Sequence, residues 1–163
     1  MLWLAEYLSE AMDLKPGMRI LDLGCGKAVS SIFFAREFGV HVTAADLWIK
    51  PHENQRRIDA AGLADRVTPI LAEAHALPFA ERAFDAIVSL DAYQYFGTDD
   101  LYLGYIAKFL KPGGHLGIVV PGPRARDRRG PRSSQALVGM GFLLLPFPRL
   151  VAPPLAEDRP RRG

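Results

Sequence analysis

The residues best suited to chemistry lie in one short run, Leu21-Asp-Leu-Gly-Cys-Gly26. The apolar residues from Met18 to Leu23 are typical of a strand that is covered on both faces. Gly24 and Gly26 follow directly, and residues 29–38 then have the pattern of a helix. A strand, a glycine turn and a helix bring backbone N–H groups and a helix N-terminus up to a ligand. The sequence therefore predicts a binding site at this turn.

Asp22 distinguishes between the possible ligands of the turn. A dinucleotide-binding turn has a further glycine where this chain has Val29, and it usually has an apolar residue at the position of Asp22. An acidic residue followed by two glycines suits a ligand that is cationic and carries an amine, rather than a pyrophosphate. This is the polarity of S-adenosylmethionine.

Strand and helix patterns alternate through the first 121 residues, which predicts an α/β fold. We expect a three-layer, Rossmann-like parallel sheet with helices on both faces and with C-terminal strands that are missing or irregular. Pro69 would confine the third strand to an edge, because proline lacks a backbone N–H. The expected strands are 18–23, 40–46, 67–72, 84–90 and 115–120, and the expected helices are 1–14, 29–38, 51 to a stop at Gly62, and 101–110.

Five motifs, in order, make the first 121 residues resemble a class I S-adenosylmethionine-dependent methyltransferase of the small-molecule type. That family often has a third glycine in the first turn, where this chain has Ala28, and we expect cofactor binding to persist with this methyl group. The motifs are Leu21-Asp-Leu-Gly-Cys-Gly26, Asp46, Glu73-Ala-His-Ala-Leu-Pro-Phe79, Phe84-Asp-Ala-Ile-Val-Ser-Leu-Asp91 and Leu110-Lys-Pro-Gly-Gly114.

The resemblance implies a set of cofactor contacts. Gly24 and Gly26 would let the backbone approach the methionine part of the cofactor, and Asp22 would attract its amino group directly or through water. Asp46, at the end of the second strand, would accept hydrogen bonds from the ribose hydroxyls, although this residue alone does not exclude NAD. Glu73 would lie near the adenine amino group. The predicted set is completed by Cys25, Leu47, Ala74, His75 and Leu90.

Some of these residues have a second interpretation. Cys25 is a reactive thiol or simply a small residue in the turn, and we favour the latter. His75 presents its backbone to the adenine edge, and its ring is either a general base or an outward-facing loop side chain. Trp48 covers one face of the adenine together with Leu47 or packs in the core.

The predicted acceptor side follows the fourth strand. Methyl transfer needs mainly an in-line arrangement of donor and acceptor, so few catalytic groups are required. Asp91 is the candidate base, Tyr93 and Tyr95 are further catalytic candidates, and Tyr93 and Gln94 are the candidate substrate contacts. Each of them could instead be a packing residue at the start of a helix.

Composition restricts the class of protein. The single cysteine excludes an internal disulfide, and the start of the chain lacks a basic signal-peptide region, so we expect a cytoplasmic protein. No apolar run approaches the length of a membrane span, and the four histidines are too scattered to predict a metal site. Residues 1–121 hold 11 basic and 15 acidic side chains, which favours a small-molecule acceptor over nucleic acid.

Residues 122–163 differ in composition from the core at 1–121, with nine arginines, no lysine and seven prolines. We expect an irregular tail, for which a frame-shifted translation is favoured over native disorder and over a basic arm for nucleic acid. Residues 137–150 would fold over the edge of the fifth strand, but Pro146 and Pro148 argue against a regular strand there. An unpaired edge makes a homodimer possible, and turnover would be impaired.

Three functions stay open on the sequence alone. The first is methyl transfer from S-adenosylmethionine to a small molecule. The second is a non-catalytic module that binds this cofactor or a partner, and the third is an NAD-binding oxidoreductase. Aminopropyl transfer from the decarboxylated cofactor is a related alternative, against which Asp22 argues weakly.

Overall fold

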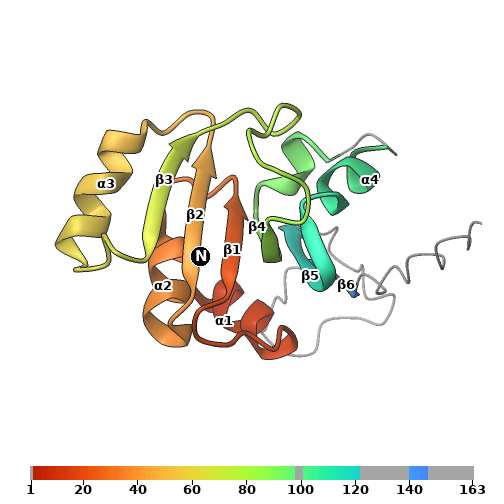
Figure 1. The fold of residues 1–163 in the computed structure, drawn as a ribbon, viewed down its shortest axis with the longest axis horizontal. Helices are drawn as coiled ribbons and strands as arrows, with labels where there is room; N and C mark the ends of the chain where they lie inside the picture. Colours follow the sequence, from red (N-terminus) through yellow and green to blue (C-terminus); the bar gives the residue numbers. More distant parts are fainter. Residues whose placement is uncertain (1, 98–100, 122–139, 147–163) are drawn as a thin grey trace, which may run out of the picture.

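The computed structural model describes residues 2–97, 101–121 and 140–146. In this part the chain forms one six-stranded sheet of order β3-β2-β1-β4-β5-β6, seen with β3 to the left and β5 to the right (Figure 1). The first five strands are parallel to one another, and β6 runs antiparallel to β5. The strands are β1 (Arg19–Leu23), β2 (His41–Asp46), β3 (Val67–Leu71), β4 (Phe84–Leu90), β5 (Leu110–Pro121) and β6 (Met140–Pro146).

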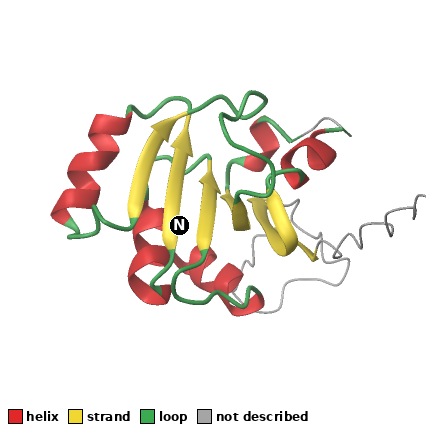
Figure 2. Cartoon of the chain, in the orientation of Figure 1, coloured by secondary structure: helices red, strands yellow, loops and turns green. Residues whose placement is uncertain are grey.

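Helices cover both faces of the sheet, as the sequence predicts for strands that are apolar on both sides (Figure 2). Side chains of α1, α2 and α3 form one core with one face of the sheet, and those of α4 form a second core with the other face. Gly117 of β5 lets α1 approach closely, because a Cβ there would lie 2.8 Å from a methyl group of Leu8. The helices are α1 (Leu2–Ala11), α2 (Val29–Phe38), α3 (Pro51–Ala60), the 3₁₀ turn η1 (Tyr93–Tyr95) and α4 (Tyr102–Ala107).

The order in which strands are added to the sheet reverses at β1. β2 and β3 lie on one side of β1, and β4 and β5 lie on its other side. Ligands of open α/β sheets bind outside the carboxyl ends of the strands at such a switch point. The fold therefore brings together the loops that follow β1, β2 and β4 at one edge.

Several local predictions are confirmed. Gly62, the predicted stop of the third helix, follows Ala60 and Ala61 with φ 70°, and its N–H donates to the carbonyl of Asp59 at 2.9 Å. Pro51 lies in the first turn of α3. Pro69 lies in β3, which is an edge strand of the sheet. The sequence predicts Asp99 or Asp100 as the cap of the helix that starts at Leu101, and both lie outside the described residues.

The fifth strand begins earlier than the sequence predicts, at Leu110 instead of His115, and the helix before it ends at Ala107. The Nζ of Lys111 lies 2.8 Å from a carboxylate oxygen of Asp85 on β4, which holds this segment against the neighbouring strand. The pairing shifts register between Phe84 and Ala86, which accommodates the added residues. These contacts join residues far apart in sequence, so local composition does not reveal them.

The prediction that no regular strand forms in residues 137–150 is wrong for its central part. Met140–Pro146 pairs antiparallel with β5, with His115 opposite Pro146 and Pro121 opposite Met140. Pro146 is tolerated because it is the last residue of an edge strand, where a missing N–H removes little pairing. β5 therefore has a partner along the edge that was expected to be unpaired. The rest of the predicted irregular tail lies outside the described residues.

Candidate cofactor site

The glycine turn after β1 is fixed to the end of β2. The backbone N–H groups of Gly24 and Cys25 both donate to the carbonyl of Ala45, at 2.9 and 3.1 Å. Gly24 has φ +75°, and a Cβ there would collide with the Cβ of Ala92, so packing alone requires glycine. Gly26 has φ +54°, but a Cβ there would meet no atom within 4 Å. Gly26 therefore borders open space that a ligand can fill.

Ala28 occupies the position at which the family often has a third glycine, and its backbone conformation explains that preference. It is the residue before α2 and has φ 58°, in the left-handed region that favours glycine. Its methyl group is fully buried, in the core and not in the open space beside Gly26. The cost of alanine at this position is therefore in backbone conformation, about 1–2 kcal/mol.

Asp22 is buried below the turn, with only 1% of its surface exposed. Its Oδ2 accepts hydrogen bonds from the hydroxyls of Ser30 and Ser31, each at 2.6 Å, and its Oδ1 has no hydrogen-bond partner among the described residues. Burial raises the pKa of Asp22 to about 6; the two serine hydroxyls oppose this shift and the charge of Asp46 adds to it. A carboxylate oxygen left without a donor is a position where an amino group would be stabilised.

Asp46 connects two loops at the carboxyl edge of the sheet. Its Oδ2 accepts from the N–H of Gly26 at 2.8 Å, and its Oδ1 accepts from the N–H groups of Trp48 and Ile49 at 2.8 and 2.9 Å. The carboxylate thus holds the glycine turn next to the loop after β2. Its Oδ2, which accepts one bond, has a remaining acceptor position that a ribose hydroxyl can use.

Three side chains that support the turn were missed from the sequence. Ser30 and Ser31 lie in the first turn of α2, where hydroxyls near a helix N-terminus are a readable signal. Asn54 of α3 is buried, and its Nδ2 donates to the carbonyl of Gly26 at 2.9 Å. It also lies 3.8 Å from the sulfur of Cys25, which is itself buried. Burial raises the pKa of the Cys25 thiol well above its ordinary value, which supports the packing interpretation of this residue.

The loop after β3 contains Glu73, Ala74 and His75, and it is joined to β2 through the N–H of Ala72, which donates to the carbonyl of Asp46 at 3.1 Å. One oxygen of Glu73 accepts from the N–H of His75 and the other lies 3.0 Å from its Nδ1, so the bonds from His75 lower the pKa of Glu73. The hydroxyl of Tyr102 donates to the carbonyl of Ala74 at 3.0 Å and orders this loop.

The loop after β4 holds the predicted acceptor-side residues. Leu90 is buried, and Asp91 follows it with φ 54° and an exposed side chain. The amide of Gln94 donates to the backbone carbonyl and to a side-chain oxygen of Asp91, both at 3.1 Å, so these two predicted residues form one unit. Tyr93 is half-buried, and burial raises its pKa.

One aromatic contact joins the loop after β2 to the loop after β4. Trp48 and Tyr95 are 72% and 69% exposed, and their ring centroids lie 5.9 Å apart in an edge-to-face arrangement. β1 lies between β2 and β4 in the sheet, so this contact crosses over the carboxyl end of β1, where the glycine turn begins. Trp48 is therefore at the surface beside the site and not in the core. Leu47, next to it, is half-exposed.

The family model described as "Methyltransferase domain" matches residues 20–114, which is more than half of the chain. The chain belongs to this methyltransferase family. Its fold and motifs are those of the class I, S-adenosylmethionine-dependent members. Methyltransferase GfsG of Streptomyces halstedii is 34% identical over 116 residues, which cover 71% of this chain and 42% of GfsG. The chain thus spans less than half the length of this curated relative.

Solved structures have the same architecture. The [4+2]-cyclase SpnF has a TM-score of 0.67 and 28% identity, covering 72% of this methyltransferase-family chain and 43% of SpnF. Geranyl diphosphate methyltransferase in complex with S-adenosylmethionine has a TM-score of 0.65 and 25% identity, covering 71% of this chain and 47% of the enzyme.

The residues present fit S-adenosylmethionine. The unpartnered Oδ1 of Asp22 suits its amino group, and the open space beside Gly26 suits its methionine part. Among residues 2–97, 101–121 and 140–146, no group of three or more histidine, cysteine or acidic side chains could hold a metal ion. No helix in this described part has the length and apolar character that crossing a bilayer requires.

Proposed function

We propose that this chain binds S-adenosylmethionine beyond the carboxyl ends of β1 and β2 and transfers its methyl group to a small molecule. The observation that carries the proposal is the buried, unpartnered Oδ1 of Asp22 below an open glycine turn at the switch point of the sheet. A pyrophosphate would bring negative charge to this carboxylate, whereas an amino group would pair with it. The site therefore favours this cofactor over NAD.

We assign each cofactor residue a role that its environment supports. Asp22 pairs with the amino group. The methionine part of the cofactor packs against backbone atoms of Gly24, Cys25 and Gly26. Asp46 accepts from the ribose hydroxyls while it holds the glycine turn. Glu73, Leu47, Leu90 and the backbone of Ala74 and His75 surround the adenine.

The cofactor supplies a methyl group on a positively charged sulfur, which leaves readily to an aligned nucleophile. The chain's own contribution is to align the acceptor. Asp91 is exposed next to the site and can accept a proton from the acceptor atom; Gln94 fixes the position of its carboxylate. Tyr93 and Tyr95 then contact the acceptor from the same 3₁₀ turn.

A small-molecule acceptor is supported by the composition of the core and by the relatives. The similar geranyl diphosphate methyltransferase is named for a small acceptor, and the acidic balance of residues 1–121 disfavours nucleic acid. We propose action in the cytoplasm, because the one cysteine is buried and no disulfide is needed. A homodimer also remains a proposal.

The test has two stages. Calorimetric titration with S-adenosylhomocysteine should show binding, and Asp46→Ala should weaken it severely because two loops lose their shared acceptor. NADH should not bind; tight NADH binding without S-adenosylhomocysteine binding would favour an oxidoreductase. Transfer of a labelled methyl group from S-adenosylmethionine to compounds in a metabolite pool then tests the reaction. Cofactor binding without transfer to any compound would favour a non-catalytic module, or a different reaction such as the cyclisation for which SpnF is named.

A further inference from the structure

Three basic residues form one row across the amino ends of three neighbouring strands. Arg19 of β1 is the register partner of His41 of β2. Val42 of β2 is the partner of Val67 of β3, so Arg66, one residue earlier, is next to His41. Neighbouring strands lie about 4.8 Å apart, which puts these side chains side by side. This row is at the opposite edge of the sheet from the proposed cofactor site.

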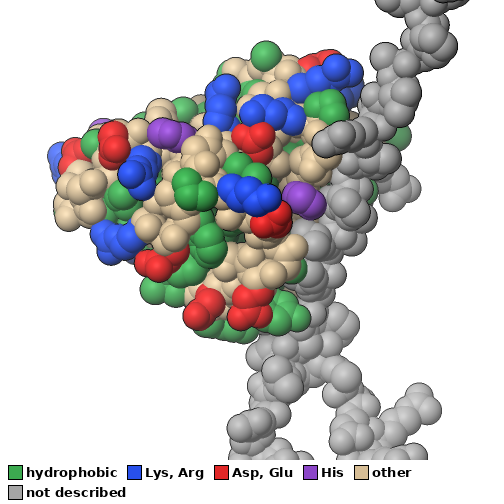
Figure 3. All heavy atoms as spheres, turned by 60° about the horizontal axis from the view of Figure 1, so that its bottom comes forward, with side chains coloured by type: hydrophobic (Ala, Val, Ile, Leu, Met, Phe, Trp, Pro, Cys, Tyr) green, Lys and Arg blue, Asp and Glu red, His purple; other side chains and the backbone are tan. Residues whose placement is uncertain are grey.

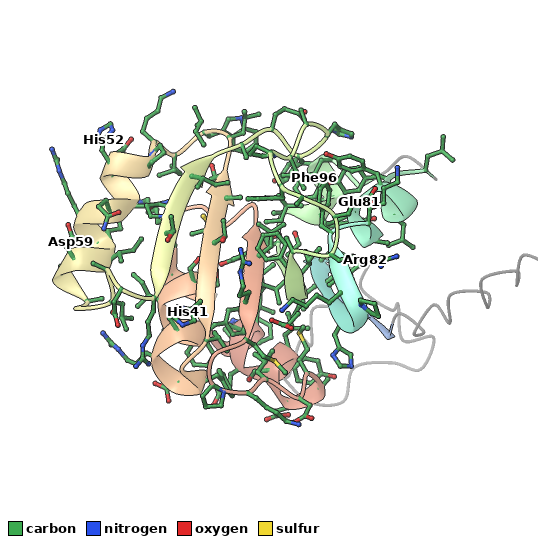
Figure 4. All side chains as sticks on the ribbon, in the orientation of Figure 1. His41, His52, Asp59, Glu81, Arg82 and Phe96 are labelled. Atoms are coloured by element: carbon green, nitrogen blue, oxygen red, sulfur yellow. The ribbon has the colours of Figure 1, made fainter. Side chains whose placement is uncertain are left out.

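The row borders a hollow of about 380 Å³. Figure 4 labels His41 at the lower end of β2, where this hollow lies. Figure 3 turns the lower edge of the molecule toward the viewer and shows basic side chains over it, interspersed with acidic ones. The lining also includes Thr43 and Thr68, which are register partners on β2 and β3. The full lining is Gly17, Arg19, His41, Val42, Thr43, Asp65, Arg66 and Thr68.

The acidic groups near the row, Asp65 and Asp85, neutralise its charge only in part. Asp65 is the one acidic residue of the lining; its carboxylate is 3.6 Å from the Nε of Arg66 and is mostly exposed, so this pair is weak. Asp85 accepts from the backbone N–H of Arg19, but its carboxylate pairs with Lys111 at 2.8 Å. In the described part of the chain, neither the guanidinium of Arg19 nor His41 forms an ion pair with a carboxylate.

The guanidinium of Arg19 instead lies 5.9 Å from the centroid of the Phe84 ring, which holds it at the sheet surface. Arg19 and Arg66 stand on either side of His41, so an anion in the hollow would be attracted by both guanidinium groups.

We propose that this hollow binds the phosphate group of a small phosphorylated ligand. The planar guanidinium groups of Arg19 and Arg66 can each donate two hydrogen bonds to phosphate oxygens. The ring of His41 can donate a further hydrogen bond between them, and the hydroxyls of Thr43 and Thr68 can donate from the next row of the sheet. The proposal does not depend on the cofactor site.

The test is a titration of the full chain with inorganic pyrophosphate at low salt, followed by calorimetry and by the amide chemical shifts of Thr43 and Thr68. Arg19→Gln and Arg66→Gln should each weaken binding roughly tenfold, because each removes a charge-assisted pair. Arg56→Gln on α3 removes the same charge from an exposed residue away from the hollow and should leave binding unchanged. Thermal unfolding midpoints of all variants report whether they fold.

The proposal is supported if binding shifts these two amides and depends on Arg19 and Arg66 but not on Arg56. It is overturned if pyrophosphate does not bind the folded protein, or if Arg56→Gln weakens binding as much as Arg19→Gln does. It is also overturned if single-stranded RNA binds through these residues and pyrophosphate does not compete with it.

Discussion

At the scale of single residues, Asp22 has opposite effects on folding and on binding. The fold buries its carboxylate with two serine donors on one oxygen and none on the other. The folded protein is therefore less stable with Asp22 ionised, while a cationic ligand would need it ionised.

We predict that Asp22→Asn stabilises the protein and weakens cofactor binding. The pKa of Asp22 is raised from 3.8 to about 6 in the folded state. Between these values the folded state holds a proton that the unfolded state has released, so the free energy of unfolding falls as pH rises. Above pH 6, ionisation of the buried Asp22 lowers the free energy of unfolding by about 3 kcal/mol. Asp22→Asn should restore about 1–3 kcal/mol of this loss. Denaturant unfolding across this pH range measures the effect.

The stability gain should shrink as pH falls towards 4 and disappear below about pH 3, where Asp22 is protonated in both states. S-adenosylhomocysteine should bind the variant roughly tenfold more weakly at pH 8, since a charge-assisted pair is lost. A lower unfolding midpoint for Asp22→Asn at pH 8 would contradict the prediction.

Gly26 offers a second prediction at this scale, with Gly62 as a matched control. Both residues have positive φ, +54° and +70°, and a Cβ at either position would meet nothing within 4 Å. Alanine should therefore cost each variant a similar amount of stability, about 1–2 kcal/mol. Only Gly26→Ala should weaken S-adenosylhomocysteine binding, because only that methyl group would enter the ligand's space. Equal losses of affinity in the two variants would show that Gly26 does not border the cofactor.

At the scale of elements, the loops after β2 and β4 meet through Trp48 and Tyr95 above the end of β1. An edge-to-face aromatic pair contributes about 0.5–1.5 kcal/mol beyond its buried area. A contact of this strength can hold two loops together over a ligand and still open readily.

We predict that Tyr95→Ala speeds the release of S-adenosylhomocysteine, by up to about tenfold if the full value of the pair is lost. The chain has two tryptophans, so Trp3→Phe leaves Trp48 as the one fluorescent indole that reports on the site. Stopped-flow fluorescence in this background gives the dissociation rate. Tyr95→Phe keeps the ring and should behave like the parent, and an equal effect of the phenylalanine and alanine variants would argue against the ring contact.

The elements themselves could largely be predicted from the sequence. The glycine turn, Asp46 and the four strands up to Leu90 follow from local apolar runs and their endings. The start of β5 and the strand Met140–Pro146 could not be predicted, because each depends on pairing with a distant partner. The hydrogen bonds from Ser30 and Ser31 to Asp22 could have been predicted, because hydroxyl side chains are common at the start of a helix. The contact of Trp48 with Tyr95 could not, because it depends on the order of the strands in the sheet.

At the scale of the whole molecule, β6 gives β5 a neighbour on the side away from β4, so β3 and β6 are the edge strands of the described sheet. The described cofactor side involves β1 to β4 and does not depend on β6. A change in the C-terminal part of the chain can therefore lower turnover without weakening cofactor binding.

We expect the 163-residue chain to bind S-adenosylhomocysteine and to turn over slowly. The prediction follows from the composition of residues 122–163, whose nine arginines and seven prolines favour few regular elements besides β6. Comparing the dissociation constant with the rate of labelled-methyl transfer, under saturating cofactor, measures the difference. Turnover in the usual enzyme range of about 1–1000 s⁻¹ would contradict it.

The buried position of Cys25 has a practical consequence. Its thiol is the single one in the chain; the residue lies in the glycine turn, only 4% of its surface is exposed, and burial raises the pKa of the thiol. An alkylating reagent should reach it only when the turn transiently opens, so the rate of alkylation measures how often the turn opens. A ligand that holds the turn closed should lower the rate of alkylation in proportion to its occupancy. The native thiol is thus an internal probe for screening compounds that bind at the turn.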